Sequence, residues 1–264
     1  MKIIDLSKTI EYRADDPFFM KIKIKHKSHK SAKWLIRILG LPFKMPLGLP
    51  FKLFPKNFVG WADDSIQKMG VHASTHIDAP WHYSATCDGK LAKTIDEVPL
   101  EWCFGEGVVI DMKHKKDFDA ITSRDIISFL EKENITLKPG MIVLIKTGRD
   151  KLYGNGTLDF YTKGTGMSGE VIEWLIDKGI KVMGIDQWGW DLPLLHQTKK
   201  AIETKNPDVF WEAHLVGQRK EYCHMEQLTN LDALPYSGFK VAVFPLKIKG
   251  ASAAPARVVA MMEN

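Results

Sequence analysis

Residues 71–82 of this 264-residue chain read VHASTHIDAPWH. We expect the rest of the chain to fold around this stretch. It holds His72, His76, Asp78 and His82, so three of the nine histidines and a carboxylate fall within eleven residues. Neutral imidazole and carboxylate groups are ligands that Zn²⁺ prefers and that Mn²⁺ and Fe²⁺ accept. The stretch therefore predicts a metal site.

The spacing of these residues restricts the backbone. In an extended strand His76 and Asp78 lie on one face, with Cα atoms about 6.6 Å apart, close enough to bind one ion. His72 would then lie about 13 Å from His76 in a straight chain. We therefore expect a turn over residues 72–76 if His72 binds the same ion. Pro80 disfavours a single helix through the whole stretch.

A second cluster, far downstream, has the composition to complete such a site. His214 and Glu226 lie twelve residues apart in a region expected to change from helix to strand. One histidine and one carboxylate would supply the ligands that the first cluster lacks for two metals. We expect His224, which lies between them, to support a ligand or to face solvent rather than to bind a metal.

The sequence gives little support for other kinds of catalytic site, for disulfide bonds, or for export or membrane insertion. Neither a HExxH motif nor a GxSxG motif is present, and Cys87, Cys103 and Cys223 show no CxxC spacing. An odd cysteine count without that spacing argues against a disulfide framework and favours a reducing compartment. The N-terminal residues lack the apolar run of a signal peptide, and charges and prolines interrupt the apolar stretch 35–54. We therefore expect a cytoplasmic protein without a membrane span.

Hydrophobic patterning predicts a layered α/β domain. Helical spacing after Thr122 and after Ser168 alternates with short β-branched runs. The runs expected to form buried strands are 2–6, 107–112, 141–147, 180–186, 239–245 and 257–260.

The net charge of +5 comes from one segment. Residues 21–60 hold ten of the 37 basic residues and no acidic residue, which leaves 27 basic and 32 acidic residues elsewhere. The segment also holds four prolines and five aromatic residues without a regular period. We interpret it as an insertion in a single domain of residues 1–264, acting as a lid or a subunit arm. No nucleic-acid-binding motif accompanies it, so no nucleic-acid partner is expected.

Taken together, these motifs resemble one protein family. Residues 72–82 are similar to the HxGTHxDxPxH motif of the "putative cyclase" family, which includes bacterial kynurenine formamidase and isatin hydrolase. The resemblance extends to the opening IDLSKTI of residues 4–10, to the block 214–226, and to APAR at 254–257. The family's usual glycine is Ser74 here, which places a side chain where the backbone normally approaches closely.

The resemblance implies a fold, a metal centre and an assembly. The fold would be a swivelling β/β/α domain that carries the basic N-terminal insertion, in a homodimer or homotetramer. One or two divalent cations, Zn or Mn, would be bound. The implied ligands of the first metal are His72, His76 and Asp78, with Asp78 able to bridge to the second. His214 would bind the second metal, and Glu226 would bind both.

The resemblance also implies the reaction. His82 would accept and donate the proton, and Phe18 and Trp188 are the candidates for aromatic contact with a small-molecule substrate. We expect a hydrolase that cleaves a carbon–nitrogen bond in an aryl formamide, amide or cyclic amide by metal-activated water. Two alternatives remain open at this point: a metal-dependent lyase or cyclase at the same site, and a non-enzymatic binding protein that uses the basic insertion.

Overall fold

The structure is a computed structural model that describes residues 1–31 and 56–263. The chain divides into two compact units, one formed by Met1–Ile10 with Val71–Asn264 and the other by Glu11–Gly70. Residues 32–55, which make up most of the predicted insertion at 21–60, lie outside the described residues. Its role as a lid or arm therefore stays a prediction.

The first unit is built on a nine-stranded mixed sheet with the order β1-β15-β13-β7-β9-β11-β12-β4-β14. At its centre β7, β9, β11 and β12 run parallel, while the strands on either side pair antiparallel. The strands are β1 (Lys2–Asp5), β4 (His76–Asp78), β7 (Phe104–Asp111), β9 (Ile142–Lys146), β11 (Val182–Ile185), β12 (Cys223–Glu226), β13 (Phe239–Ala242), β14 (Ala253–Pro255) and β15 (Val259–Met262). Two-residue strands form the pairs β5 (Thr86–Cys87) with β6 (Lys90–Leu91) and β8 (Ala120–Ile121) with β10 (Gly166–Met167).

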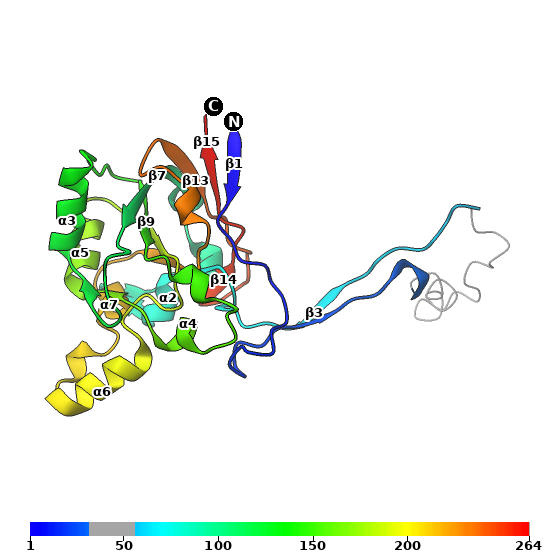
Figure 1. Ribbon diagram of the computed structural model, residues 1–264, viewed down its shortest axis with the longest axis horizontal. Coiled ribbons are helices and arrows are strands. Elements are labelled where there is room, and N and C mark those ends of the chain that lie inside the picture. The colour runs from blue at the N-terminus through cyan, green and yellow to red at the C-terminus, as the bar shows by residue number, and fades with distance from the viewer. Residues whose placement is uncertain (32–55, 264) are drawn as a thin grey trace. The chain divides into compact units, whose positions relative to one another are not determined.

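The sheet is apolar on both faces, as expected when other elements cover each side. Along β9, Val143 and Ile145 pack into one core cluster, and Ile142 and Leu144 pack into the other. The first cluster contains the apolar faces of α3 and α5, and Figure 1 shows both helices on the same side of the sheet. The site described below lies on this helix-covered face.

Helices in the first unit are short, and local signals explain their ends. Thr122 and Asp125 form a capping box at the start of α3, and Pro80 is the first residue of α2. The α-helices are α2 (Pro80–Tyr83), α3 (Ser123–Lys132), α4 (Asp159–Thr162), α5 (Gly169–Asp177), α6 (Leu194–Thr204) and α7 (Glu212–Leu215). The 3-10 helices are η2 (Ile95–Glu97), η3 (Leu100–Cys103), η4 (Arg149–Leu152), η5 (Pro207–Val209), η6 (Val216–Gln218) and η7 (Leu231–Ala233).

The predicted mixed α/β fold is confirmed, and each of the six predicted strands corresponds to an observed strand within a few residues. The sequence patterns did not separate out β12 and β14. These strands are three or four residues long, and each is buried along its whole length. β12 alternates apolar and polar residues over only four positions, and β14 is a run of three small residues, so neither pattern is long enough to predict a strand.

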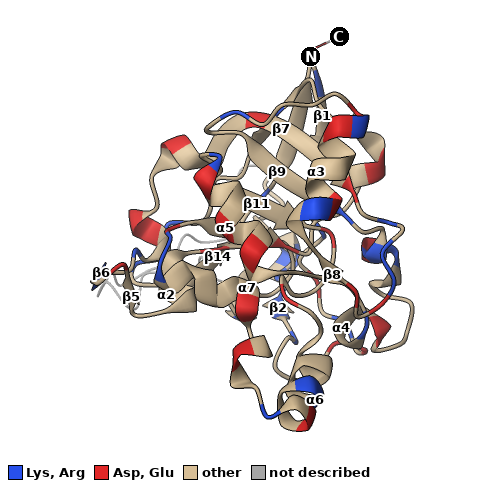
Figure 2. Ribbon diagram, turned by 90° about the vertical axis from the view of Figure 1, so that its left-hand side faces the viewer, with Lys and Arg blue, Asp and Glu red and all other residues tan. Residues whose placement is uncertain are grey.

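In the second unit, β2 (Lys23–Lys25) pairs antiparallel with β3 (Ser65–Lys68). Lys27, two residues after β2, forms a salt bridge of 2.7 Å with Asp63. Acidic and basic residues are interspersed over the face of the molecule drawn in Figure 2. In the described part of the chain, none of the helices is both long and apolar enough to cross a membrane.

Candidate metal centre

Strand register brings the two sequence clusters together. β4 lies between β12 and β14, and its antiparallel register with β12 places His224 opposite Asp78 and Glu226 opposite His76. Residues directly opposite in such a pair point to the same face, with Cβ atoms about 5 Å apart. Four side chains able to bind a metal therefore converge from two strands that are separated by about 150 residues in the sequence.

The expected bend before β4 is present and delivers His72. Residues 71–75 form turns and bends, and Ser74 has φ 59°, in the left-handed region that glycine adopts without strain. The side chain of Thr75 holds the turn, because its Oγ1 donates to the carbonyl of Gln227 at 2.6 Å and accepts from the amide of Lys8 at 2.9 Å. Nδ1 of His72 then lies 2.8 Å from the carboxylate of Asp78.

Asp78 is the centre of the cluster. Its carboxylate is only 1 % exposed and turns one oxygen to each side. Oδ1 lies 2.8 Å from Nδ1 of His72 and 3.2 Å from Nε2 of His76. Oδ2 lies 3.2 Å from Nε2 of His224 and 3.8 Å from Nε2 of His82. One carboxylate therefore faces four imidazoles, the arrangement expected of a bridging ligand.

Glu226 repeats this pattern on the neighbouring strand. Its Oε2 lies 3.8 Å from Nε2 of His76, and its Oε1 lies 3.5 Å from Nε2 of His224. Burial would raise the pKa of Glu226, but the hydrogen bond with His224 and the surrounding imidazoles lower it to about 2. Burial likewise opposes the charged form of His224, and the two carboxylates outweigh it and raise its pKa to about 9. The cluster therefore has a strong electrostatic preference for positive charge.

His214 joins from α7 and is oriented by two neighbours. Asp191 contacts Nδ1 of His214 through Oδ2, and the same carboxylate accepts hydrogen bonds from the amides of His214 and Ala213. The ring of Trp211 stacks on His214 with centroids 4.5 Å apart and planes 6° apart. With Nδ1 and one ring face occupied, Nε2 of His214 is the nitrogen left to bind a metal.

His82 lies on α2 at the more exposed edge of the cluster, with 22 % of its side chain exposed. Its ring lies 4.1 Å from the ring of His72 and 5.5 Å from that of Trp211. Burial lowers the pKa of His82 to about 4, reinforced by His72, His214 and His224 and opposed by Asp78. A neutral ring at this edge can accept a proton from a group in the adjoining space.

The donors fit a divalent cation. Nε2 of His76, Oδ1 of Asp78 and Nε2 of His224 are buried, and among the described residues none makes a well-aligned hydrogen bond, although a group of opposite charge lies within 3.2 Å of each. Buried polar atoms without well-aligned hydrogen bonds are rare in folded proteins and call for an explanation such as an ion. Two groups of candidate donor atoms each lie within 4.8 Å of one another, and they share Asp78: Asp78, His214, His224 and Glu226; and His72, Asp78 and His82.

The six residues expected from the sequence to form the metal centre and its acid–base group lie together in this cluster. Of the two expected substrate contacts, Phe18 belongs to the second unit, where it is 80 % exposed and packs edge-on against Phe19. Trp188 lies after β11 and packs edge-on against Tyr161 at 5.6 Å.

Sequence reasoning gave no role to Asp191, Tyr83 or the tryptophans that pack on the histidines, and it gave His224 only the alternatives of supporting a ligand or facing solvent. His224 is fully buried, which excludes the solvent-facing alternative and leaves the supporting role as a prediction. The signal was present, because His224 and Glu226 have the two-residue spacing that had placed His76 and Asp78 on one face. No comparable signal marks Asp191, since its partner is 23 residues away.

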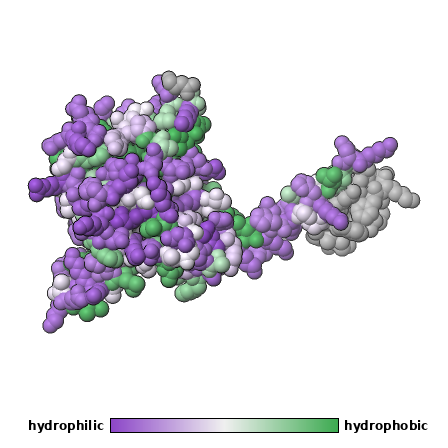
Figure 3. Space-filling view, viewed as in Figure 1, coloured by the Kyte–Doolittle hydropathy of each residue, from purple (hydrophilic) through white to green (hydrophobic). Residues whose placement is uncertain are grey.

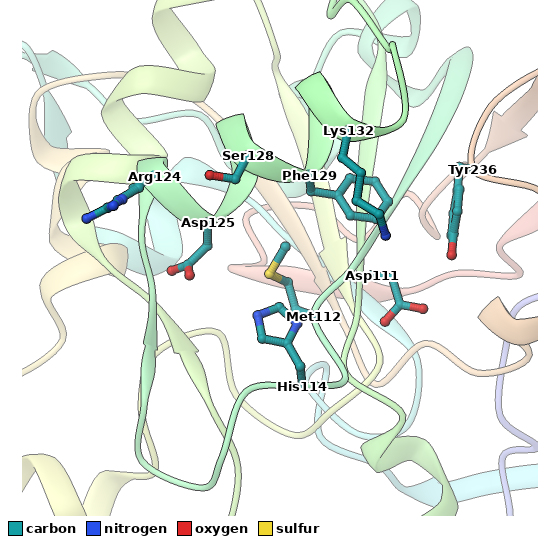
Figure 4. A pocket seen from close by; sticks show the side chains of 9 residues that line it. All are labelled: Asp111, Met112, His114, Arg124, Asp125, Ser128, Phe129, Lys132 and Tyr236. Carbon is teal, nitrogen blue, oxygen red and sulfur yellow. The ribbon is translucent and has the colours of Figure 1, made fainter.

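Among the cavities lined by described residues of the first unit, the two that have the largest volumes lie away from this cluster. The one in Figure 4, of about 480 Å³, lies beside α3, over Met112 and Phe129. Its carboxylates are paired with lysines, since Asp111 lies 2.9 Å from Lys146 and Asp125 lies 3.0 Å from Lys115. The other, of about 740 Å³, is lined by residues near the two termini, where Figure 3 shows hydrophobic side chains at the surface. No cluster residue lines either cavity.

Known proteins are similar to this chain in sequence and in fold. Residues 4–192 match the family profile described as "Putative cyclase". The chain is 27 % identical to isatin hydrolase from Roseibium aggregatum over 201 residues, 74 % of this chain and 73 % of that protein. It is 28 % identical to kynurenine formamidase from Paracidovorax citrulli over 192 residues, 72 % of this chain and 76 % of that protein. The structure of isatin hydrolase A from Labrenzia aggregata bound to benzyl benzoate aligns with a TM-score of 0.71 and 24 % identity, covering 100 % of this chain and 94 % of that one.

Proposed function

Because the chain belongs to the cyclase family, we propose that it is a metal-dependent hydrolase that cleaves a carbon–nitrogen bond in a small aryl formamide, amide or cyclic amide. The relatives it matches are hydrolases by name, one acting on isatin and others on a kynurenine formamide. The cation is proposed to be Zn²⁺ or Mn²⁺, which accept this combination of imidazole and carboxylate ligands.

One observation carries the proposal: the carboxylates of Asp78 and Glu226 face the buried Nε2 atoms of His76 and His224, and neither nitrogen makes a well-aligned hydrogen bond. This geometry suits a cation placed between the carboxylates and the imidazoles. A divalent cation bound here would polarise a carbonyl oxygen and lower the pKa of a water molecule. Asp78, His76 and Glu226 would hold it, and the fold fixes them through strand pairing rather than through a loop.

His82 has the position of a proton carrier. In hydrolysis, water adds to the carbonyl carbon and its proton passes to Nε2 of His82; the carbon–nitrogen bond then breaks as His82 returns the proton to the leaving nitrogen. The products are a carboxylic acid and an amine, so atoms and protons balance. The half-exposed ring of Trp211, 5.5 Å from His82, offers an aromatic surface suited to an aryl substrate.

Isatin and N-formylkynurenine are the first substrates to test, with purified protein loaded with Zn²⁺ or Mn²⁺. We expect turnover that a chelator abolishes and the added metal restores. In water labelled with ¹⁸O, a hydrolase places the label in the product carboxylate. An unlabelled product would instead indicate lyase or cyclase chemistry.

Two variants separate metal binding from proton transfer. Asp78→Ala should lose metal and activity together, because it removes the ligand that faces all four imidazoles. His82→Ala should keep its metal content near that of the wild type and lose turnover. Equal loss of metal in both variants would make His82 a ligand, and a wild type that binds no divalent cation would refute the proposal.

A further inference from the structure

We propose that His224 is a ligand of a second cation, and that with His214, Asp78 and Glu226 it closes that position with protein donors. The motif histidines then form the other position, which stays open for water and substrate. This inference rests on the proposed function, since it assigns ligands within the same centre. The centre would then hold one cation whose ligands are all protein groups, which supports the site, and one cation with an open coordination position, which takes part in the reaction.

The carboxylates of Asp78 and Glu226 lie between His76 on one side and His224 on the other. Each turns one oxygen to His76, at 3.2 Å from Asp78 and 3.8 Å from Glu226. Each turns its other oxygen to His224, at 3.2 Å from Asp78 and 3.5 Å from Glu226. Cross-strand pairing produces this symmetry, because His224 is opposite Asp78 and His76 is opposite Glu226. His224 is therefore the counterpart of His76 on the second side.

The environment of the His224 ring leaves Nε2 for a cation. Nδ1 lies 2.9 Å from the hydroxyl of Tyr83, which is 3.4 Å from the carbonyl of Asp78 and can donate to it. With a cation bound, Nδ1–H can donate to that hydroxyl, which leaves the lone pair of the neutral ring on Nε2. A lone pair directed at two carboxylates is repulsive unless a cation lies between them.

Packing holds the ring in this orientation and keeps water away. His224 is 0 % exposed, and its ring stacks on Trp190 at 4.7 Å with planes 7° apart. Tyr83 lies on another side at 5.2 Å with planes 12° apart. A ring fixed in this way can present Nε2 in one direction only, as a ligand held by its neighbours does.

Ligand number then distinguishes the two positions. The donor atoms of Asp78, His214, His224 and Glu226 all lie within 4.8 Å of one another, which supplies the four ligands typical of a closed zinc site. On the other side the histidines reach solvent, with 31 % of the His72 side chain and 22 % of the His82 side chain exposed. Catalytic zinc sites keep such an open position.

Metal titration of the full-length protein tests the assignment. Metal-free wild type, His224→Gln and Tyr83→Phe would be titrated with Zn²⁺ against a competing chelator and with Co²⁺ by visible absorption. Circular dichroism would monitor folding. His114→Gln is the matched control, because it removes an exposed histidine that lines the cavity of Figure 4. The wild type should bind two cations, one of them more tightly.

The variants should differ in how much affinity for the tighter cation they lose. Loss of a residue that only orients a ligand costs about 10–100-fold in metal affinity, so Tyr83→Phe should weaken the tighter cation within that range. His224→Gln removes the ligand itself and should weaken it by more than about 100-fold, with a changed Co²⁺ spectrum. His114→Gln should match the wild type.

Two results would overturn the assignment without affecting the proposed function. One is a His224→Gln variant that binds two cations with the affinity and Co²⁺ spectrum of the wild type. If that variant does not fold, the ¹⁵N resonances of the wild-type ring decide, assigned through their shift in Tyr83→Phe. Protons on both ring nitrogens of His224 in the Zn²⁺-loaded protein would show an imidazolium that pairs with the carboxylates instead of a ligand.

Discussion

Replacing Asp191 with asparagine isolates the effect of ligand orientation, because the change is nearly isosteric and Asp191 contacts no other carboxylate of the cluster. Oδ1 of Asp191 accepts from the amide of Ala213 at 2.7 Å, and Oδ2 accepts from the amide of His214 at 3.2 Å and contacts its Nδ1. An asparagine has one accepting oxygen for these two positions. Its NH₂ group must therefore face a donor on one side.

Either orientation of the amide has a measurable cost. With NH₂ towards Ala213, a buried amide N–H loses its partner, which costs about 1–3 kcal/mol of folding free energy. With NH₂ towards His214, Nδ1 must accept, so the ring proton moves to Nε2 and blocks the metal-binding nitrogen. Partners that orient a ligand contribute about 10–100-fold to metal affinity, or about 1.4–2.7 kcal/mol.

The assay is Zn²⁺ affinity by chelator competition, combined with urea unfolding of the metal-free protein. Asp191→Asn should weaken Zn²⁺ binding, destabilise the metal-free fold, or do both, within the ranges above. Asp208→Asn, an exposed change of the same chemistry, is the control. If Asp191→Asn matches the wild type in both measurements, Asp191 does not orient His214.

Two further predictions concern the packing and the protonation of the first unit. Gly217→Ala would place a Cβ 2.2 Å from Cδ2 of the buried Tyr83. It should lower the free energy of unfolding by about 1–3 kcal/mol and weaken metal binding. Gly70→Ala is the control and should do neither, because its Cβ would meet nothing within 4 Å. Burial raises the pKa of Asp186 to about 6, although the hydrogen bonds from Thr147 oppose this shift. Between about pH 4 and 6 the folded carboxyl therefore keeps a proton that the unfolded carboxyl loses. The contribution of Asp186 to stability is complete below about pH 4 and should fall by up to about 3 kcal/mol as the pH rises through 6. Urea unfolding of the wild type relative to Asp186→Asn checks the sign, and a relative stability that rises over this window would contradict it.

The elements that the sequence predicts well are those whose burial leaves a pattern. β9 holds a run of four apolar residues before Lys146. α3 begins at a capping box, and its apolar residues recur every three to four positions. β12 alternates apolar and polar residues over only four positions, and β14 consists of two alanines and a proline, so both patterns are too short to predict a strand. Their identity depends on pairing with β4, which is set by contacts across the sheet rather than by neighbours in the chain.

In the metal centre, too, residue spacing predicts some of the contacts, and the others depend on how the chain folds. The position of His76 and Asp78 on one face follows from strand geometry, and the bend that brings in His72 follows from the distance it must cover. Their pairing with Glu226 and His224 depends on strand order, in which β4 and β12 are neighbours although far apart in sequence. Asp191 acts on His214 across 23 residues of sequence, a contact that no local pattern encodes, whereas Trp211 lies three residues before His214.

The charges of the cluster indicate why such an arrangement persists. Two buried carboxylates carry a large desolvation cost, and replacing buried charged groups with apolar ones is often neutral or stabilising. Here the fold places both carboxylates within 4 Å of buried imidazoles, and the pKa of Glu226 falls to about 2 while that of His224 rises to about 9. Without a cation, protons on the histidines must balance this negative charge; with one, the same nitrogens are free to bind it. The groups that cost most to bury are therefore those whose burial a divalent cation compensates.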